Sequence, residues 1–158
     1  MAKVRSLAVL GGFVLLCFAV AGLGGWATST SVSTWYQTLE KPAWTPPGSV
    51  IGLVWNVLYA SMAVAAWLVW RRRTDKSLTP AMTCFGSQLA LNLLWSVCFF
   101  LLRSPGLALL EICVLWVAVA LTLFMFWRVS IVAGLLFVPY LAWVSFAGFL
   151  NATVWHLN

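Results

Sequence analysis

Five long apolar runs constrain the fold of this chain more than any other feature of its sequence. They cover residues 7–26, 51–70, 81–102, 106–127 and 131–155. A helix needs roughly 20 apolar residues to cross the hydrocarbon core of a bilayer, and each run reaches that length. None of them alternates between apolar and polar residues, as the strands of a membrane barrel do. We therefore expect an all-α membrane protein, one domain over residues 1–158, built as a bundle of five transmembrane helices.

The composition excludes the soluble alternatives. Only 8% of the residues are charged and 63% are hydrophobic, whereas a soluble domain is roughly one quarter charged. This excludes an ordinary cytosolic enzyme, a disordered chain and a secreted disulfide scaffold. The net charge of +6 does not indicate nucleic-acid binding, because the basic residues lie between the apolar runs. The four cysteines form no C-x-x-C pair, so we expect buried free thiols and no metal site.

Basic residues also predict the orientation of the bundle. With five crossings, the side of the N-terminus carries Lys3, Arg5, Arg71, Arg72, Arg73, Lys76 and Arg128, and the other side carries Lys41 and Arg103. Because cytoplasmic loops are enriched in Lys and Arg, we expect a bacterial cell-membrane protein with its N-terminus in the cytoplasm. The first run also resembles a cleaved secretory signal. Its apolar residues continue past the small residues at 19–21, which favours a retained helix.

Local signals mark where three of the helices begin. Thr79 and Ser104 each precede a proline, and Ser130 precedes the fifth run. A hydroxyl group accepts a hydrogen bond from the first turn of a helix, and proline is favoured at the first helical position. We therefore expect these three residues to be N-caps. Pro139 lies inside the fifth run, where we expect it to kink the helix and widen any adjacent cavity.

The longest connection, residues 27–50, is rich in aromatic residues and proline. It contains Trp35, Tyr36 and Trp44 together with three prolines that restrict its backbone. An apolar loop at the end of a bundle has two interpretations. It is either an interfacial aromatic belt or a lid that folds over a ligand cavity, and its composition favours neither.

The eleven tryptophans divide into two groups. Five of them, at positions 26, 67, 70, 127 and 155, lie at span ends, where an amphipathic indole is favoured. Trp55, Trp95, Trp116 and Trp143 lie inside the spans. A buried indole N–H group usually requires an acceptor, which in hydrocarbon must come from the protein or from a ligand. These four side chains therefore either pack between helices or line a cavity.

Three helix faces combine aromatic with polar side chains. The faces contain Trp55, Tyr59 and Met62 on the second run, Gln88, Asn92, Trp95, Ser96 and Phe99 on the third, and Tyr140, Trp143, Ala147 and Asn151 on the fifth. Polar groups inside a span often join helices to one another. They equally suit the orientation of a flat, conjugated ligand in an aromatic cavity.

Three further features carry weaker signals. Glu111 is an acidic residue inside a span, which is by default a functional candidate, although it lies near enough to the span's end to reach water or Arg103. His156 could ligate a metalloporphyrin, but a surface histidine is the better interpretation. Gly86 and Ala90 form a small-x-x-x-small pattern that could mediate a homodimer.

Three motifs resemble the TspO/translocator protein family, also called tryptophan-rich sensory proteins. They are W-Y-x-x-L-x-K-P-x-W-x-P-P-G at residues 35–48, Q-L-A-L-N-L-L-W-S at 88–96, and V-P-Y-L-A-W at 138–143 followed by Phe146, Ala147 and Asn151. The resemblance implies a five-helix membrane protein, commonly a homodimer, with the first loop as a lid. It also implies a cavity that binds porphyrins such as protoporphyrin IX and hydrophobic drug-like molecules.

The resemblance also implies roles for individual residues. By motif position, Trp55 and Trp143 are similar to the tryptophans that bacterial members use in light-dependent porphyrin breakdown. Asn92 and Trp95 match cavity positions of the third helix, and Tyr36 matches the aromatic residue of the lid. One departure concerns sterols. Ala152 and His156 stand where cholesterol-binding members carry tyrosine and arginine, so we expect no sterol motif of that type.

Three functions follow as hypotheses. The first is a membrane porphyrin-binding protein in tetrapyrrole transport, sequestration or stress sensing. The second is a slow enzyme that degrades porphyrin with light and oxygen, in which Trp55 and Trp143 would be the catalytic residues. The third is a structural or regulatory protein whose cavity is incidental. The candidate ligand-binding residues are Tyr36, Trp55, Tyr59, Asn92, Trp95, Phe99, Trp143 and Ala147. The expected partners are the lipid bilayer and a flat hydrophobic molecule, with no obligatory cofactor.

Overall fold

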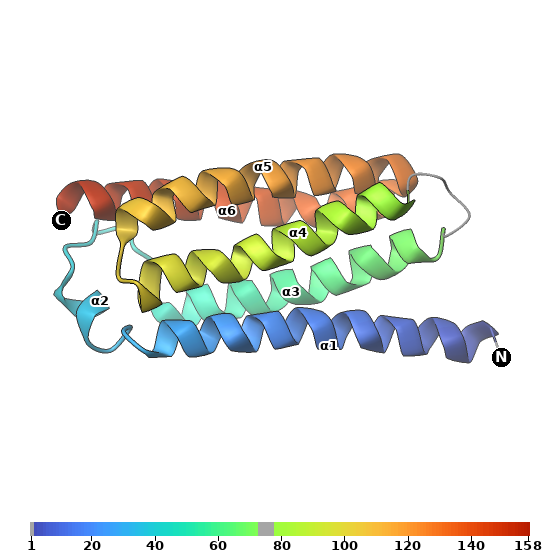
Figure 1. Cartoon of the computed structure of the whole chain (residues 1–158), viewed down its shortest axis with the longest axis horizontal. Coiled ribbons are helices and arrows are strands. Elements are labelled where there is room, and N and C mark those ends of the chain that lie inside the picture. The colour runs from blue at the N-terminus through green and yellow to red at the C-terminus, as the bar shows by residue number, and fades with distance from the viewer. Residues whose placement is uncertain (1, 73–77) are drawn as a thin grey trace.

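The computed structural model describes residues 2–72 and 78–158 as a bundle of long helices (Figure 1). The elements are α1 (Ala2–Ser29), α2 (Trp35–Thr38), α3 (Gly48–Trp70), α4 (Leu78–Ser96), η1 (Val97–Leu101), α5 (Pro105–Val129) and α6 (Ile131–Leu157). Five of these segments are long and apolar enough to cross a membrane, with η1 continuing α4 as a π-helical turn. The predicted all-α fold with five transmembrane helices is confirmed, and the chain is a multi-pass membrane protein.

The helices extend beyond the predicted apolar runs. The first helix is predicted over residues 7–26 but spans Ala2–Ser29. In its last turn the hydroxyl groups of Thr28 and Ser29 donate to the carbonyl groups of Gly24 and Trp26. Hydropathy marks the part of a helix that lies in hydrocarbon, whereas backbone hydrogen bonding continues into the polar interface.

Two of the three predicted N-caps are confirmed. Ser104 Oγ accepts a hydrogen bond from the backbone nitrogen of Leu107, and Ser130 Oγ accepts one from that of Ala133. The predicted cap at Thr79 is wrong, because α4 already includes Leu78. Pro139 lies inside α6, which continues through it to Leu157. Proline is therefore accommodated inside this helix, while the predicted kink stays a prediction.

The helices are arranged so that the connections gather at two ends of the bundle. Figure 1 shows the N-terminus and the C-terminus at opposite ends, with α2 at the end of the C-terminus. The most extensive contacts between helices join α5 to α6, α4 to α5, and α1 to α3. Lys3, Arg5, Arg71, Arg72 and Arg128 lie at or near the ends of helices on the side of the N-terminus, as predicted. Arg73 and Lys76 lie outside the described residues.

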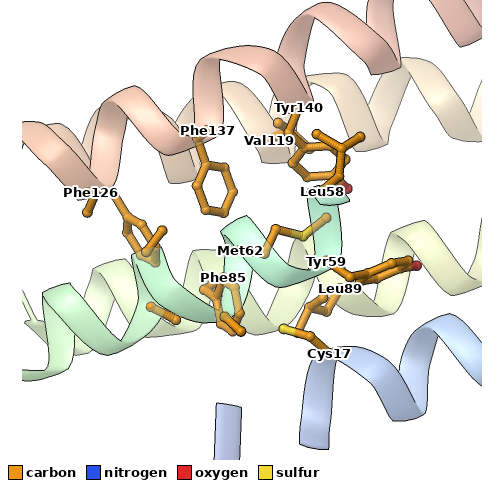
Figure 2. Packing of buried hydrophobic residues seen from close by; sticks show 14 of the residues in the cluster. Cys17, Leu58, Tyr59, Met62, Phe85, Leu89, Val119, Phe126, Phe137 and Tyr140 are labelled. Atoms are coloured by element: carbon orange, nitrogen blue, oxygen red, sulfur yellow. The ribbon is translucent and has the colours of Figure 1, made fainter. Parts of the chain in front are cut away.

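The half of the bundle next to the N-terminus is tightly filled, and we call it the packed half. Phe85, Phe126 and Phe137 meet there, with ring centroids 5.8 Å apart for Phe85–Phe126 and 5.0 Å for Phe126–Phe137. Met62 is fully buried beside them, and Figure 2 shows these side chains converging between the helices. Alanines 63, 65 and 66 of α3 are also fully buried. Small side chains let the helix backbones approach closely, so this half leaves little free volume.

Candidate functional site

The other half of the bundle contains a cavity of about 370 Å³. Its walls come from α1, α3, α4, η1 and α6, and the connection between α1 and α3 contributes Val32 and Tyr36. All eight candidate ligand-binding residues line it, namely Tyr36, Trp55, Tyr59, Asn92, Trp95, Phe99, Trp143 and Ala147. Faces predicted separately on three helices are thus brought together around one space. A volume of this size suits a small-molecule site.

Residues at helical spacing on α3 form one wall of the cavity. Ile51, Trp55 and Tyr59 follow one another at intervals of four residues and therefore lie on the same face. The Trp55 ring meets the Trp143 ring of α6 edge to face, with centroids 6.4 Å apart and an interplanar angle of 90°. This pair presents perpendicular indole surfaces to the cavity, a geometry favoured between aromatic rings.

A layer of hydrogen-bonded polar side chains closes the cavity toward the packed half, and we call it the polar layer. The Tyr59 hydroxyl donates to Asn92 Oδ1 at 2.5 Å, and Asn92 Nδ2 donates to the Tyr140 hydroxyl at 2.7 Å. The Tyr140 hydroxyl donates in turn to Gln88 Oε1 at 3.0 Å. These groups satisfy one another across α3, α4 and α6. For Gln88 and Asn92, the interpretation as polar contacts between helices is therefore supported.

Two cavity tryptophans differ in their hydrogen bonding. Trp95 Nε1 donates to Asn151 Oδ1 at 3.1 Å, and Asn151 Nδ2 donates to the carbonyl oxygen of Pro105. Trp143 Nε1 is buried and, among the described residues, has no hydrogen-bond partner. An unpaired buried donor costs about 1–3 kcal/mol. The Trp143 N–H group thus differs from that of Trp95 in lacking an acceptor among the described residues.

The connection at residues 30–47, which we call the lid, closes the end of the cavity. The Tyr36 ring packs against Phe99 and Phe100 with centroids 6.1 and 5.7 Å away. Partial burial in this contact raises the pKa of the Tyr36 hydroxyl above its usual value through desolvation. Lys41 Nζ donates to the carbonyl oxygens of Tyr36 and Leu39, both at 2.8 Å. Of the two interpretations of this loop, the structure supports the lid.

The C-terminal residue and the π turn hold the lid from two sides. Asn158 exchanges two hydrogen bonds with the backbone of Glu40, and Ser31 Oγ donates to the carbonyl oxygen of Phe100 at 2.7 Å. The π turn η1 buries three consecutive side chains, Cys98, Phe99 and Phe100, beneath the lid. Such turns occur frequently at functional sites.

The sequence analysis did not single out several parts of the cavity wall, of which two carried a signal. No residue of the first helix is among the predicted site residues, yet Ala21, Gly24, Gly25 and Thr28 line the cavity. Their small size at helical spacing was the available signal. The second omission is Asn56, an exposed amide on α3 that also lines the cavity. Its signal was a polar residue inside an apolar run.

Other candidates lie outside the cavity. Trp116 is 42% exposed and donates to Ser145 Oγ at 2.8 Å, so its indole belongs to an α5–α6 contact. Glu111 is 8% exposed and, among the described residues, neither carboxyl oxygen has a hydrogen-bond partner, so Arg103 does not pair with it. His156 is exposed. Gly86 and Ala90 share an exposed face of α4, where the homodimer contact stays a prediction.

The prediction of buried free thiols holds for two of the four cysteines. All four are free, but only Cys17 and Cys98 are buried, whereas Cys84 is partly exposed and Cys113 is exposed. Among residues 2–72 and 78–158, no group of His, Cys, Asp and Glu is placed to hold a metal ion.

Comparisons with known proteins agree with this architecture. The sequence model of the TspO/MBR family matches residues 13–156. The tryptophan-rich protein TspO of Chlorobaculum tepidum is 42% identical over 147 residues, which cover 90% of this chain and 91% of that protein. The protein CrtK of Rhodobacter capsulatus is 36% identical over 147 residues, covering 92% of each chain. The human translocator protein is 40% identical over 127 residues, covering 78% of this chain and 75% of that protein.

Proposed function

This chain belongs to the TspO/MBR family, and we propose that it is a membrane protein that binds porphyrins or related tetrapyrroles in the cavity beneath the lid. Binding there would serve transport, sequestration or stress sensing of the tetrapyrrole. The single observation that carries the proposal is the aromatic lining of this cavity, to which α3, α4, η1 and α6 contribute Trp55, Trp95, Phe99 and Trp143. A flat ligand that stacks on aromatic rings suits this wall.

The aromatic geometry supports a flat ligand. Trp95 and Phe99 are stacked with centroids 5.2 Å apart, and Trp55 faces the cavity from α3. Planar conjugated molecules gain dispersion energy against such surfaces, and edge contacts with the perpendicular Trp55–Trp143 pair add to it. The polar layer offers little to a ligand, because Asn92 already uses its amide oxygen and nitrogen for two tyrosines. Shape and stacking therefore supply most of the affinity.

A titration with protoporphyrin IX tests the proposal. Purified protein in detergent is titrated in the dark while tryptophan fluorescence and porphyrin absorption are followed. We expect saturable binding, and we expect Trp143→Phe to weaken it by about 1 kcal/mol, or roughly fivefold in Kd, because the smaller ring removes aromatic surface from the cavity wall.

The matched control is Trp116→Phe. Trp116 is an indole outside the cavity whose N–H group is already paired with Ser145, so its removal should leave Kd unchanged. Equal effects of the two substitutions would contradict the proposed role of Trp143. Absence of saturable binding by the unmodified protein would contradict the function itself.

A light-dependent reaction is the second candidate function. The Trp55–Trp143 pair, 6.4 Å apart in the cavity wall, would place two oxidisable indoles beside an excited porphyrin. Illuminating the complex in air and without oxygen separates the two candidates. Loss of porphyrin absorption that requires oxygen and is slowed by Trp55→Phe and Trp143→Phe would favour a degrading enzyme. Stable absorption under light would favour a carrier or sensor.

A further inference from the structure

We propose that ligands reach the cavity sideways from the bilayer, through an opening between α1 and α3. This inference rests on the proposed function, because it concerns the route to the same cavity. We call the opening between α1 and α3 the window, and its edges are Gly25 of α1 and Gly48, Gly52 and Asn56 of α3. The ligand class is therefore a flat, apolar molecule dissolved in the membrane, taken from the half of the bilayer next to the lid.

Exposure of the cavity lining locates the window. Most residues that line the cavity are buried or partly buried, and the exposed ones are the four that edge the window. Gly48, Gly52 and Asn56 follow one another at intervals of four residues on α3. They form a stripe beside the inner stripe of Ile51, Trp55 and Tyr59, so one helix carries both the wall and the margin of the opening.

The glycines of the window leave open space. A Cβ atom built on Gly25, Gly48 or Gly52 would meet no atom within 4 Å outside its own local helix. Close packing does not explain them, in contrast to Gly24, where a Cβ would lie 3.3 Å from Ser96 Oγ. Because these three glycines also line the cavity and are exposed, a larger side chain at any of them would have free space at the margin of the opening.

Contacts close the lid side, the packed side and the seam between α3 and α6, where the Trp55 ring meets the Trp143 ring. On the lid side, Tyr36 packs against Phe99 and Phe100, and Lys41 fixes the loop through two hydrogen bonds. On the opposite side lie the polar layer and the packed half. Further along the same helix pair, α1 and α3 are joined by Cys17 in the core and by the hydrogen bond from Trp67 Nε1 to the carbonyl oxygen of Ser6. Passage through the window breaks none of these contacts.

Asn56 gives the window a polar edge. Its Nδ2 donates to the carbonyl oxygen of Gly52 at 2.9 Å, and no hydrogen bond to another described residue uses its Oδ1. An exposed amide inside a span faces lipid, where an unpaired acceptor is unfavourable. A ligand passing through the window, or one that projects from it, can donate to this oxygen.

The route limits what kind of transport the protein performs. Because the packed half is filled, the cavity ends at the polar layer within the described part of the chain. Exchange with the lid-side half of the bilayer passes only the margin formed by α1 and α3. We therefore infer that the protein takes up and releases its ligand on one side of the membrane rather than passing it through the bundle.

Binding kinetics in a bilayer test the window. Protein in phosphatidylcholine nanodiscs is mixed with protoporphyrin IX, and tryptophan quenching gives the association rate. Dilution into excess empty vesicles then gives the dissociation rate. Gly52→Phe and Gly25→Phe each place a ring in the opening, from α3 and from α1. We expect both rates to fall together by roughly tenfold with little change in Kd, because the barrier rises and the bound state does not change.

Two controls separate the routes. Gly22→Phe puts the same ring on α1 at an exposed glycine that does not line the cavity, and should leave both rates unchanged. Lys41→Ala releases the lid and should also leave them unchanged. If Lys41→Ala accelerates binding while both window variants behave like the unmodified protein, access is through the lid and the inference is wrong. Unchanged rates in all four variants also overturn it.

Two remaining outcomes are also informative. If one window variant does not fold, the other tests the same opening from the facing helix. If the unmodified protein binds no porphyrin, the proposed function fails and the inference fails with it. Saturable binding with unaffected window variants overturns only the route.

Discussion

The two halves of the bundle use largely the same helices for opposite purposes, although α5 contributes to the packed core and not to the lining of the cavity. In the packed half, phenylalanine and alanine side chains fill the interior, and Phe126 and Phe137 are completely buried (Figure 2). In the half beneath the lid, larger tryptophans and tyrosines surround a cavity of about 370 Å³. Larger side chains thus enclose more empty space, because their rings form walls rather than interdigitating. Close packing of side chains in the packed half stabilises the bundle. The half beneath the lid has fewer such contacts, because it contains the cavity.

Among the substitutions that test this difference between the halves, Phe137→Ala should cause the largest change, a loss of stability. The Phe137 ring is fully buried and contacts Phe85, Phe126 and Tyr140. Removing it leaves a cavity in the packed half, and we expect the free energy of unfolding to fall by about 3–5 kcal/mol. Denaturant unfolding in detergent, followed by circular dichroism, measures this. A loss below about 1 kcal/mol would show that the packed half tolerates voids as the other half does.

Ala147→Phe should weaken ligand binding and leave the free energy of unfolding nearly unchanged, which is the opposite of Phe137→Ala. Ala147 lines the cavity, so a ring there occupies the space of the ligand without displacing a packed core. We expect protoporphyrin affinity to fall roughly a hundredfold, about 2.7 kcal/mol, with unfolding nearly unchanged. Val138→Phe, at a 45% exposed position of the same helix that does not line the cavity, is the control and should leave affinity intact. Equal affinities of the two variants would mean that the ligand binds elsewhere.

Asn92→Ala should affect both halves, because the polar layer lies between them. The substitution removes the partner of the Tyr59 and Tyr140 hydroxyl groups. We expect the free energy of unfolding to fall by about 1–2 kcal/mol. Asn56→Ala removes an exposed amide and should change it by less than about 0.5 kcal/mol. Thermal unfolding of the two variants side by side checks the contrast, and equal melting temperatures would contradict it.

Glu111→Met should give the smallest change, and in the stabilising direction. Both carboxyl oxygens of Glu111 are buried without a hydrogen-bond partner among the described residues. Methionine keeps a similar volume and removes the unpaired polar atoms, so we expect stability to rise by about 1 kcal/mol. Thermal unfolding measures the rise. A decrease would mean that the carboxyl group has a partner or a role that the described contacts do not contain.

The sequence predicted the parts of the fold that depend on local chemistry. Apolar runs of sufficient length predicted the five helices, and the hydroxyl groups of Ser104 and Ser130 predicted two helix starts. The candidate ligand residues also gathered as expected, because residues spaced by three or four positions share a face in any helix. For Trp116 the sequence left two alternatives open, and the structure shows packing against α6, since spacing alone does not tell which face meets which neighbour.

What the sequence did not predict depends on contacts between distant segments. The pairing of Tyr59 and Tyr140 through Asn92 joins three helices, and each residue alone only indicated a polar group in a span. The window needs α1 and α3 to lie beside each other, so Gly25 and Gly52 had no visible relation in the sequence. Which residues of distant segments become neighbours is decided by packing between helices rather than by local sequence preference.

The π turn between α4 and α5 has a consequence for how the length of this chain can vary. A π turn contains one more residue than the α-helical turn it replaces, and here the backbone nitrogen of Leu102 bonds to the carbonyl oxygen of Val97. Deleting a single residue from η1 would restore regular α-helical hydrogen bonding, and the residues on either side could keep their places, because the residue removed is the one that the π turn holds in excess. The deletion would take one side chain from the segment Val97–Leu101, in which Cys98, Phe99 and Phe100 are buried beneath the lid. A one-residue change of length is thus absorbed locally at this turn, whereas the same deletion from a regular α-helical turn would rotate the rest of that helix by about 100°.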